Sequence, residues 1–312
     1  MLTITLNPAL DLCAHVAVVE PDRKMHCSNV IVEPGGGGIN VARAAVRLGA
    51  PVTAAAFIAD DCDKRFLALL AAERVHVEAI SVTGPLRESL TFVETSTSRQ
   101  YRFVLPGSAI DAVHFDAGLD RIAELCVDET LVVVSGSTPP GVNADDVQRL
   151  IRTVGSSDAY VIADTSGEAL SAVAVAGVAL MKPSVRELSI FVGASIASHE
   201  EIEAAARRLL ASGPNGVVLV SLGAAGALLV RSSDASQWLH APRVRSLSTV
   251  GAGDCLVAGV AVALQRGQSM IDAARYGVAA GTAATLAMGT GLFIAADVER
   301  LLPQVLVTGV AT

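Results

Sequence analysis

The segment 248–254, Ser-Thr-Val-Gly-Ala-Gly-Asp, combines small residues with one carboxylate and is followed by the apolar stretch 255–264. Such a stretch is typical of a buried helix. The segment would lie at the helix N-terminus, where free backbone N–H groups and the positive end of the helix dipole bind anions. Asp254 is either a first-turn acid that stabilises the helix or a general base beside a phosphoryl group in transfer.

A second glycine-rich segment follows Glu33 and Pro34 and opens a predicted helix. The glycines at 35–38 would allow a ligand to approach the backbone closely, and they would give the hinge freedom that a lid needs. Their spacing matches neither a dinucleotide fingerprint nor a lysine-bearing P-loop, so a flexible turn without a ligand is the alternative. Asn40, in the first helical turn, could bind a substrate hydroxyl or cap the helix.

Polar residues after predicted strands, together with basic residues in or beside the segments 12–33 and 88–105, could bind a phosphorylated sugar. Asp11 follows the first strand; an ionised carboxylate only accepts hydrogen bonds, which suits sugar hydroxyls, although a solvated loop acid is equally compatible. Lys24, Arg87 and Arg102 could bind a phosphomonoester together, although singly such residues are usually surface charges. Ser137 follows another strand, where α/β sheets keep ligand contacts.

Two turns suit a nucleotide and its metal. Residues 221–227 link two strand-like runs through glycines, as a nucleotide-binding turn or an ordinary hairpin would. Lys182 ends a further strand. Glu187 could reach a hydrated metal or could be a first-turn helix acid. The six histidines are dispersed, so neither a Ser-His-Asp triad nor histidine metal ligation is expected.

The composition limits the class of protein. Of 312 residues, 52% are hydrophobic and 17% are charged, which is typical of a globular chain. The net charge of −8 argues against a general nucleic-acid surface. Five scattered cysteines favour a reducing cytoplasm, without a disulfide framework or zinc site. The N-terminus does not resemble a signal peptide, and the charge-free stretch 277–296 predicts a buried helix followed by a loop, not a membrane span.

Strands and helices alternate, which predicts a doubly wound, mostly parallel α/β sheet. Continuous apolar strands are expected at 131–135, 160–164 and 216–221, and helices at 63–73, 144–153 and 200–211. Ligands in such sheets bind at the carboxyl ends of the strands. Residues 12–33 and 88–105 alternate polar and apolar residues, with a hairpin turn near 96–98. We expect them to form a small β-sheet lid that closes a site or contacts a second subunit.

Taken in this order, these segments resemble the ribokinase-like (PfkB-type) sugar kinase family. The resemblance runs from Asn7 to Gly291 and includes both glycine-rich segments. Within the family, the segments 33–34, 100–103, 135–137, 166–171 and 277–281 are similar to the minor type of 6-phosphofructokinase. The related 1-phosphofructokinases and tagatose-6-phosphate kinases usually carry a lysine where this chain has Gly37, which favours the 6-phosphate enzyme.

The resemblance implies a role for each matching residue on the sugar side. Asp254 would take the proton of the sugar's C1 hydroxyl. The amides of Gly251, Ala252 and Gly253 would hold the transferring phosphoryl group. The sugar would contact Asp11, Gly35, Gly36 and Asn40. Its phosphate would contact Lys24, Arg87, Arg102 and Ser137, with Lys24 reaching across a homodimer from the partner's lid.

The resemblance also implies a site for ATP and Mg²⁺. The expected ATP contacts are Lys182, Ser184, Glu187, Ser221, Leu222, Gly223, Ala224, Ala225, Gly226, Ser246, Ala280 and Ala284. Glu187 would bind Mg²⁺ through water, and a monovalent cation such as K⁺ would bind near Ser248, Val250, Ala284 and Gly289. Ser184 stands where the family commonly has asparagine, which bears on water order around Mg²⁺. Ala287 and Gly291 replace more polar or basic residues, which weakens the cation site.

We therefore expect residues 1–312 to form one ribokinase-like kinase domain of a cytoplasmic, glycolytic homodimer that binds neither nucleic acid nor membrane. The expected reaction is the ATP-dependent phosphorylation of fructose 6-phosphate to fructose 1,6-bisphosphate. Tagatose 6-phosphate and fructose 1-phosphate are the alternative acceptors. A non-catalytic sugar-phosphate sensor is a hypothesis of a different class, and a nucleoside kinase is a weaker one, because it has less need of the three basic residues.

Overall fold

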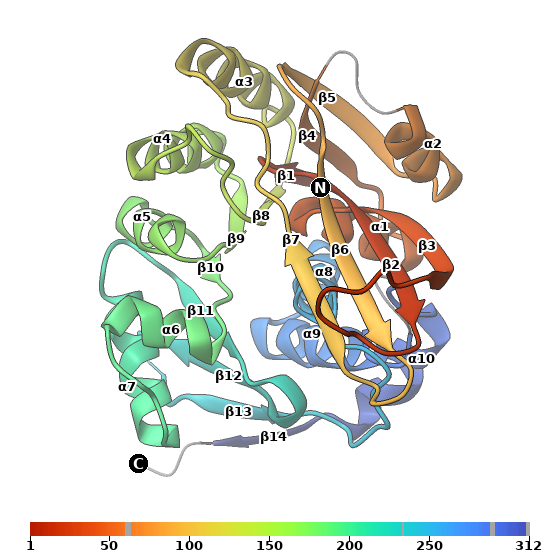
Figure 1. Cartoon of the computed structure of the whole chain (residues 1–312). Helices are drawn as coiled ribbons and strands as arrows, with labels where there is room; N and C mark the ends of the chain where they lie inside the picture. The colour runs from red at the N-terminus through yellow and green to blue at the C-terminus, as the bar shows by residue number, and fades with distance from the viewer. Residues whose placement is uncertain (60–63, 233, 288–290, 310–312) are drawn as a thin grey trace.

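The computed structural model describes residues 1–59, 64–232, 234–287 and 291–309. A ten-stranded sheet has the order β14-β13-β12-β11-β10-β9-β8-β1-β4-β5, with helices on both faces (Figure 1). The strands from β11 to β5 pair in parallel, and β11 to β14 form an antiparallel edge. The predicted mostly parallel α/β sheet is therefore confirmed. Its strands are β1 (Leu2–Thr5), β4 (Thr53–Ala59), β5 (His76–Val82), β8 (Leu131–Ser135), β9 (Tyr160–Asp164), β10 (Leu180–Met181), β11 (Val217–Ser221), β12 (Gly226–Arg231), β13 (Gln237–His240) and β14 (Leu306–Gly309).

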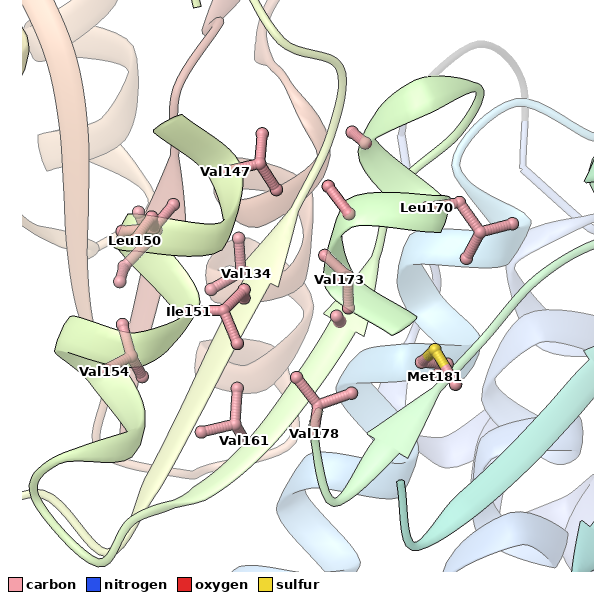
Figure 2. Packing of buried hydrophobic residues seen from close by; sticks show 14 of the residues in the cluster. Val134, Val147, Leu150, Ile151, Val154, Val161, Leu170, Val173, Val178 and Met181 are labelled. Atoms are coloured by element: carbon pink, nitrogen blue, oxygen red, sulfur yellow. The ribbon is translucent and has the colours of Figure 1, made fainter. Parts of the chain in front are cut away.

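The parallel strands are buried on both faces, which explains their continuous apolar sequences. In β8, Val132 and Val134 join the core on one face, whereas Leu131 and Val133 join the core on the other. The first core includes side chains of α3 (Ala112–Leu125), α4 (Ala144–Gly155), α5 (Glu168–Ala176), α6 (Val185–Val192) and α7 (His199–Leu210). Figure 2 shows how α4 and α5 pack on β8, β9 and β10 through residues such as Ile151.

The opposite face carries α1 (Gly37–Arg47), α8 (Ala252–Gln265), α9 (Met270–Ala284) and α10 (Ala295–Leu301). The predicted buried helix after residue 254 is α8. A Cβ on its Gly259 would lie 2.8 Å from the Cα of Gly277, so this glycine lets α8 and α9 approach closely. The charge-free stretch begins inside α9, as predicted, and part of the following loop lies outside the described residues. No helix in the described ranges combines the length and apolar character that a membrane crossing requires.

A separate four-stranded sheet, the lid sheet, has the order β3-β2-β6-β7. It consists of β2 (Ala9–Val16), β3 (Cys27–Gly35), β6 (Arg87–Glu94) and β7 (Gln100–Val104), which cover the two predicted lid segments. The predicted hairpin is confirmed, because β6 and β7 pair antiparallel and Ser98 turns with a φ of 59°. In Figure 1 the lid sheet lies in front of α1, α8 and α9. The remaining helix α2 (Lys64–Ala72) packs its Phe66 and Leu70 into the core beneath β3 and β4.

Candidate active site

The N-terminus of α8 leaves backbone N–H groups without acceptors in the described chain. Gly251 precedes the helix with a left-handed φ of 74°, and no side chain of the described residues caps it. In contrast, α4 begins with a capping box formed by Asn143 and Asp146. Within the described chain, the amides of Gly251 and Gly253 have no backbone acceptor, and Ala252 N–H is 3.4 Å from the Thr249 carbonyl. The N–H groups of Gly251 and Gly253 are therefore available to a ligand at the positive end of the helix, whereas that of Ala252 has a long hydrogen bond.

Asp254 stands at this helix end in an environment that disfavours its charge. Burial, reinforced by the charge of Asp164, raises its pKa from 3.8 to about 7, although Asn40 and Lys182 oppose the rise. A carboxyl group with a pKa near neutrality can both accept and release a proton at physiological pH. The position therefore suits a general base better than a purely structural first-turn acid.

Asn40 donates to this carboxylate. Its Nδ2 lies 2.8 Å from the Asp254 Oδ2, and the Asn40 side chain is 5% exposed. The suggestion that it caps the helix is wrong, because Gly36 holds the N-cap position and makes no side-chain cap. The role of Asn40 toward a sugar hydroxyl stays a prediction, and its observed partner is the candidate base.

A cavity of about 260 Å³ opens in front of Asp254. Its walls come from the carboxyl ends of three neighbouring strands and from α6 and α8, and they include Ser135, Gly136, Ser137, Asp164, Thr165, Ser166, Lys182, Glu187, Gly253 and Asp254. This is the edge at which parallel α/β sheets bind ligands. Four residues that were predicted for the site therefore line one cavity: Asp254, Lys182, Glu187 and Ser137.

A buried ion pair crosses the floor of the cavity. Lys182 Nζ lies 3.0 Å from Asp164 Oδ1, and the two side chains are 6% and 12% exposed. Burial alone would lower the pKa of Lys182, but the carboxylates of Asp164 and Glu187 outweigh it and raise that pKa. The ammonium also lies 3.5 Å from where a Cβ on Gly253 would be, so the glycine leaves this cation next to the helix end.

Glu187 has two roles in the geometry. Its Oε2 accepts from the Ser184 amide at 2.7 Å, and the Ser184 Oγ accepts from the Glu187 amide at 3.3 Å, which closes a capping box at the start of α6. The first-turn role considered for Glu187 is therefore present. The same side chain lines the cavity, so its position toward a hydrated metal also remains available.

The glycine run is packed by the chain itself. A Cβ on Gly37 would lie 2.4 Å from the Ser135 Oγ, and one on Gly38 would lie 2.7 Å from the Ile4 carbonyl oxygen. A Cβ on Gly35 would meet the Asp11 carboxylate at 2.2 Å. The glycines thus let α1 approach β1 and β8, and the expectation of a loose turn is wrong.

The basic residues expected to bind a phosphate are only partly gathered. Burial raises the pKa of Asp11, and the charges of Arg87 and Arg102 are among those that oppose the rise, so both guanidinium groups lie near this carboxylate. Arg87 Nε donates to the Asn7 carbonyl at 3.1 Å, and Asn7 Nδ2 donates to the Ser137 Oγ at 3.1 Å. Asn7 therefore connects the arginine side of the site to the serine side.

Lys24 does not join this group within the subunit. It lies in the exposed connection between β2 and β3, and no contact links it to Arg87 or Arg102 in the described part of the chain. Its predicted role thus depends on a second subunit.

The nucleotide-type turn and the cation loop have defined structures. Residues 221–227 include a short 3₁₀ turn between antiparallel β11 and β12, so the hairpin is confirmed. Ser221 N–H donates to the Pro183 carbonyl at 2.8 Å, which places this turn next to the Ser184 helix end. The predicted ATP contacts Ala280 and Ala284 are fully buried, whereas Ser246 is exposed.

In the proposed cation loop, Ser248 Oγ accepts from the Val250 amide at 3.2 Å. The Leu247 amide donates to the Thr285 carbonyl at 2.8 Å, which ties the loop to the end of α9. Gly289, the last predicted member of the cation site, lies outside the described residues.

Sequence reasoning missed Asp164 and Asn7 as site residues. Asp164 ends a predicted strand, so the rule that ligands bind at strand carboxyl ends could have selected it. Asn7 follows β1 in the same way. Arg43 was also missed; it is 1% exposed, and such a buried charge must be paired, but its spacing of three residues from Asn40 was the only indication.

Comparisons with known proteins identify the family of this chain. A model of the pfkB family carbohydrate kinases matches residues 4–296. The ATP-dependent 6-phosphofructokinase isozyme 2 of Mycobacterium tuberculosis is 41% identical over 96% of this chain and 88% of its own length. The isozyme 2 of Escherichia coli is 37% identical over 96% of both chains, and the 1-phosphofructokinase of Xanthomonas campestris is 34% identical over 84% of this chain and 83% of its own.

Solved structures give the same result. Phosphofructokinase-2 from Escherichia coli in complex with potassium superposes with a TM-score of 0.91 at 36% identity, covering 97% of this chain and 98% of that chain. The same enzyme in complex with fructose-6-phosphate superposes with a TM-score of 0.88 at 35% identity and the same coverage. The ribokinase-like fold and its small separate sheet are thereby confirmed.

Proposed function

The chain belongs to the pfkB family of carbohydrate kinases, and on that premise we propose that it transfers the γ-phosphoryl group of ATP to the C1 hydroxyl of fructose 6-phosphate. The product would be fructose 1,6-bisphosphate, as in glycolysis. The observation that carries this proposal is Asp254 at the uncapped end of α8, facing Lys182 across one cavity. Phosphoryl transfer needs positioned charges and a base at the acceptor hydroxyl, and Lys182 and Asp254 would supply them.

In the proposed mechanism Asp254 accepts the proton of the C1 hydroxyl as that oxygen attacks the phosphorus. The amides of Gly251, Ala252 and Gly253 donate to the equatorial oxygens of the transferring group, where negative charge has to be stabilised. Lys182, held by Asp164, adds a positive charge beside the same helix end. Closure of the lid sheet excludes water, so that ATP is not hydrolysed.

The residues around the cavity also fit Mg²⁺. The carboxylates of Asp164 and Glu187 line it, and carboxylate oxygen is a preferred ligand of this ion. The described chain holds no group of three or more His, Cys, Asp or Glu side chains that could bind a metal by themselves. We infer that Glu187 would hold Mg²⁺ through water beside the ATP phosphates. When bound, it neutralises phosphate charge.

We infer fructose 6-phosphate as acceptor from the arginine side of the site and from Gly37. Arg87, Arg102 and Ser137 would bind its phosphate, while Asp11 and Asn40 would bind its hydroxyls. A side chain at position 37 would collide with Ser135, so a lysine does not fit there as the chain is packed. Tagatose 6-phosphate and fructose 1-phosphate remain the alternative acceptors, and relatives named 1-phosphofructokinase support the second.

A steady-state comparison of the three sugar phosphates with MgATP tests this proposal. We expect the highest kcat/KM for fructose 6-phosphate. A tenfold preference for either other sugar would overturn the substrate assignment while leaving the kinase assignment intact. No ADP release with any phosphosugar would favour the non-catalytic sensor.

Arg87→Ala should raise the KM for the sugar phosphate by about tenfold or more while leaving the KM for ATP nearly unchanged. A hydrogen bond to a charged group contributes about 1.5–3 kcal/mol, and each 1.4 kcal/mol is a factor of ten. Arg121→Ala is the control, because Arg121 pairs on the surface with Glu78 and Glu124. Equal increases in both KM values would remove the phosphate-binding role of Arg87.

We also propose a homodimer formed through the lid sheet. Val30, Ile31, Phe103 and Val104 of this sheet are 48–60% exposed, which is a large apolar surface for an unpartnered lid. Lys24 lies in the exposed connection between β2 and β3 of this sheet and would reach the partner's phosphate site.

We propose a separate site for K⁺, which the carbonyl groups near Ser248, Val250 and Ala284 would hold.

The ten-stranded sheet and the lid sheet would form one kinase domain, since β3 ends at Gly35 and α1 begins at Gly37 without a linker. The protein would work in the cytoplasm, where ATP and sugar phosphates are available.

A further inference from the structure

Arg43 lies directly behind the candidate base. It is among the largest fully buried side chains of the described residues, although it carries a permanent charge. Nε and Nη2 contact the Glu73 Oε1 at 2.9 and 2.6 Å, and Nη2 also contacts the Glu33 Oε1 at 3.3 Å. Nη1 donates to the Pro34 carbonyl at 2.8 Å and to the Asn40 Oδ1 at 3.2 Å. All five N–H groups of the guanidinium thus have an acceptor.

The contact with Asn40 determines which way the amide points. A guanidinium has donors and no acceptor, so Asn40 must turn its oxygen toward Arg43. The nitrogen of the same amide then faces the other way, and Nδ2 lies 2.8 Å from the Asp254 Oδ2. An amide turned by 180° would place its oxygen against the carboxylate and lose this hydrogen bond.

We propose that Arg43 is a positioning residue for catalysis, which holds the Asn40 amide in the orientation that donates to the Asp254 carboxylate. Arg43 itself does not touch the reacting groups. Its contacts with Glu33 and Pro34 also connect this arrangement to the end of the lid strand β3. The expected effect on kcat rests on the proposed kinase function. The orientation of the Asn40 amide rests on the geometry alone.

A purely structural role is the competing explanation, because Arg43 also joins α1 to Glu73 at the end of α2. Arg47 provides a matched control for it. Arg47 lies one helical turn further along α1 and contacts the same Glu73 at 3.0 Å through Oε2, but its hydrogen bonds reach the carbonyls of Gly291 and Phe293 and not Asn40.

The decisive experiment is a double-mutant cycle between Arg43→Lys and Asn40→Ala, with Arg47→Met as control. Arg43→Lys keeps a cation next to Glu73, so the variant retains a partner for that buried carboxylate. We expect it to lower kcat with fructose 6-phosphate by roughly 10- to 100-fold, because misplacing a catalytic group by about 1 Å can have this effect. The KM for ATP should stay nearly constant, and Arg47→Met should leave kcat nearly unchanged.

In the Asn40→Ala background, Arg43→Lys should have almost no further effect on kcat, since the amide that it orients is gone. An equal fold-loss in both backgrounds would overturn the proposal, as would an equal loss from Arg47→Met. Such additivity would show that Arg43 acts on the fold and not through Asn40.

A measurement independent of turnover separates this inference from the proposed reaction. The side-chain NH₂ signals of Asn40 can be assigned by NMR from their loss in Asn40→Ala. In the wild type they should exchange slowly with water, and in Arg43→Lys at least about tenfold faster, since a hydrogen-bond difference of 1.4 kcal/mol is tenfold. Unchanged exchange would overturn the positioning role even if the kinase is active. A wild type inactive on every sugar phosphate, with faster exchange in the variant, would instead refute only the proposed reaction.

Discussion

Replacing Asp254 by asparagine should lower kcat by about 10²–10⁴, the usual contribution of a positioned general base. The substitution keeps the shape of the side chain and removes its ability to accept a proton. The KM for the sugar phosphate should change little, because the expected phosphate contacts lie on Arg87, Arg102 and Ser137. Steady-state kinetics with fructose 6-phosphate and MgATP measure the effect. Turnover that survives the substitution would show that another group removes the proton.

Asp272 offers a matched control for the role of a first-turn acid. It stands three residues after the N-cap Ser269 of α9, as Asp254 stands three residues after Gly251 of α8. Both carboxylates lie in the first turn of a helix, where a negative charge stabilises the helix dipole. Asp272→Asn should therefore leave kcat unchanged, whereas a loss similar to that of Asp254→Asn would indicate that helix stability, not base catalysis, explains the effect.

Asp254→Asn should also change the pH dependence of the free energy of unfolding. The pKa of Asp254 is raised in the folded chain from 3.8 to about 7. Between these values the folded protein holds a proton that the unfolded chain has released, so the free energy of unfolding of the wild type falls as the pH rises. Asp254→Asn removes this loss and should be more stable than the wild type above pH 7, with the difference vanishing below 3.8. Urea unfolding at several pH values measures it.

Lys182→Met should destabilise the protein by about 3–5 kcal/mol, because it leaves the buried Asp164 carboxylate without its partner. Adding Asp164→Asn should recover most of this loss, since the uncompensated charge is then removed. The free energies of unfolding of Lys182→Met and of the double variant test the prediction. Arg300→Met is the control: its ion pair with Asp297 is on the surface, with side chains 56% and 29% exposed, and such pairs contribute about 0–1 kcal/mol.

Lys182→Met should also change catalysis. The ammonium is one of the groups that lower the pKa of Asp254, so its loss should move the acidic limb of the kcat profile to higher pH. The KM for ATP should rise as well, because the proposed phosphate site loses a cation. A Lys182→Met variant as stable as the wild type would contradict the role of the Lys182–Asp164 ion pair in stability. An unchanged pH profile would contradict the effect of Lys182 on the pKa of Asp254.

Much of the fold could be predicted because its determinants are local. The strands β8, β9 and β11 are continuous apolar runs, since they are buried on both faces, and the helices between them carry their own caps and periodicity. The small residues before α8 likewise indicate an uncapped helix end within a few residues of sequence. Ligands of parallel α/β sheets bind at the carboxyl ends of the strands, and this regularity located the general region of the site.

The partners of the site residues could not be predicted in the same way. Asn40 and Asp254 are 214 residues apart, and only the packing of α1 beside α8 brings their side chains together. Lys182 meets Asp164 because β10 and β9 are neighbours in the sheet. Strand order and helix packing set such contacts, and neither is encoded in the periodicity of the segments involved.

The sequence by itself therefore determined the α/β class, the small-residue loop before α8 and the identity of Asp254 as the acid in the first turn of that helix. Only the tertiary structure decided that the glycines at 35–38 are packed against β1 and β8, that Lys24 stands apart from Arg87 and Arg102 of the same chain, and that Arg43 donates to the Asn40 oxygen. The physical reason is the same in each case. Backbone conformation follows from neighbouring residues, whereas the charge, burial and hydrogen bonds of a side chain depend on residues that folding brings from elsewhere in the chain.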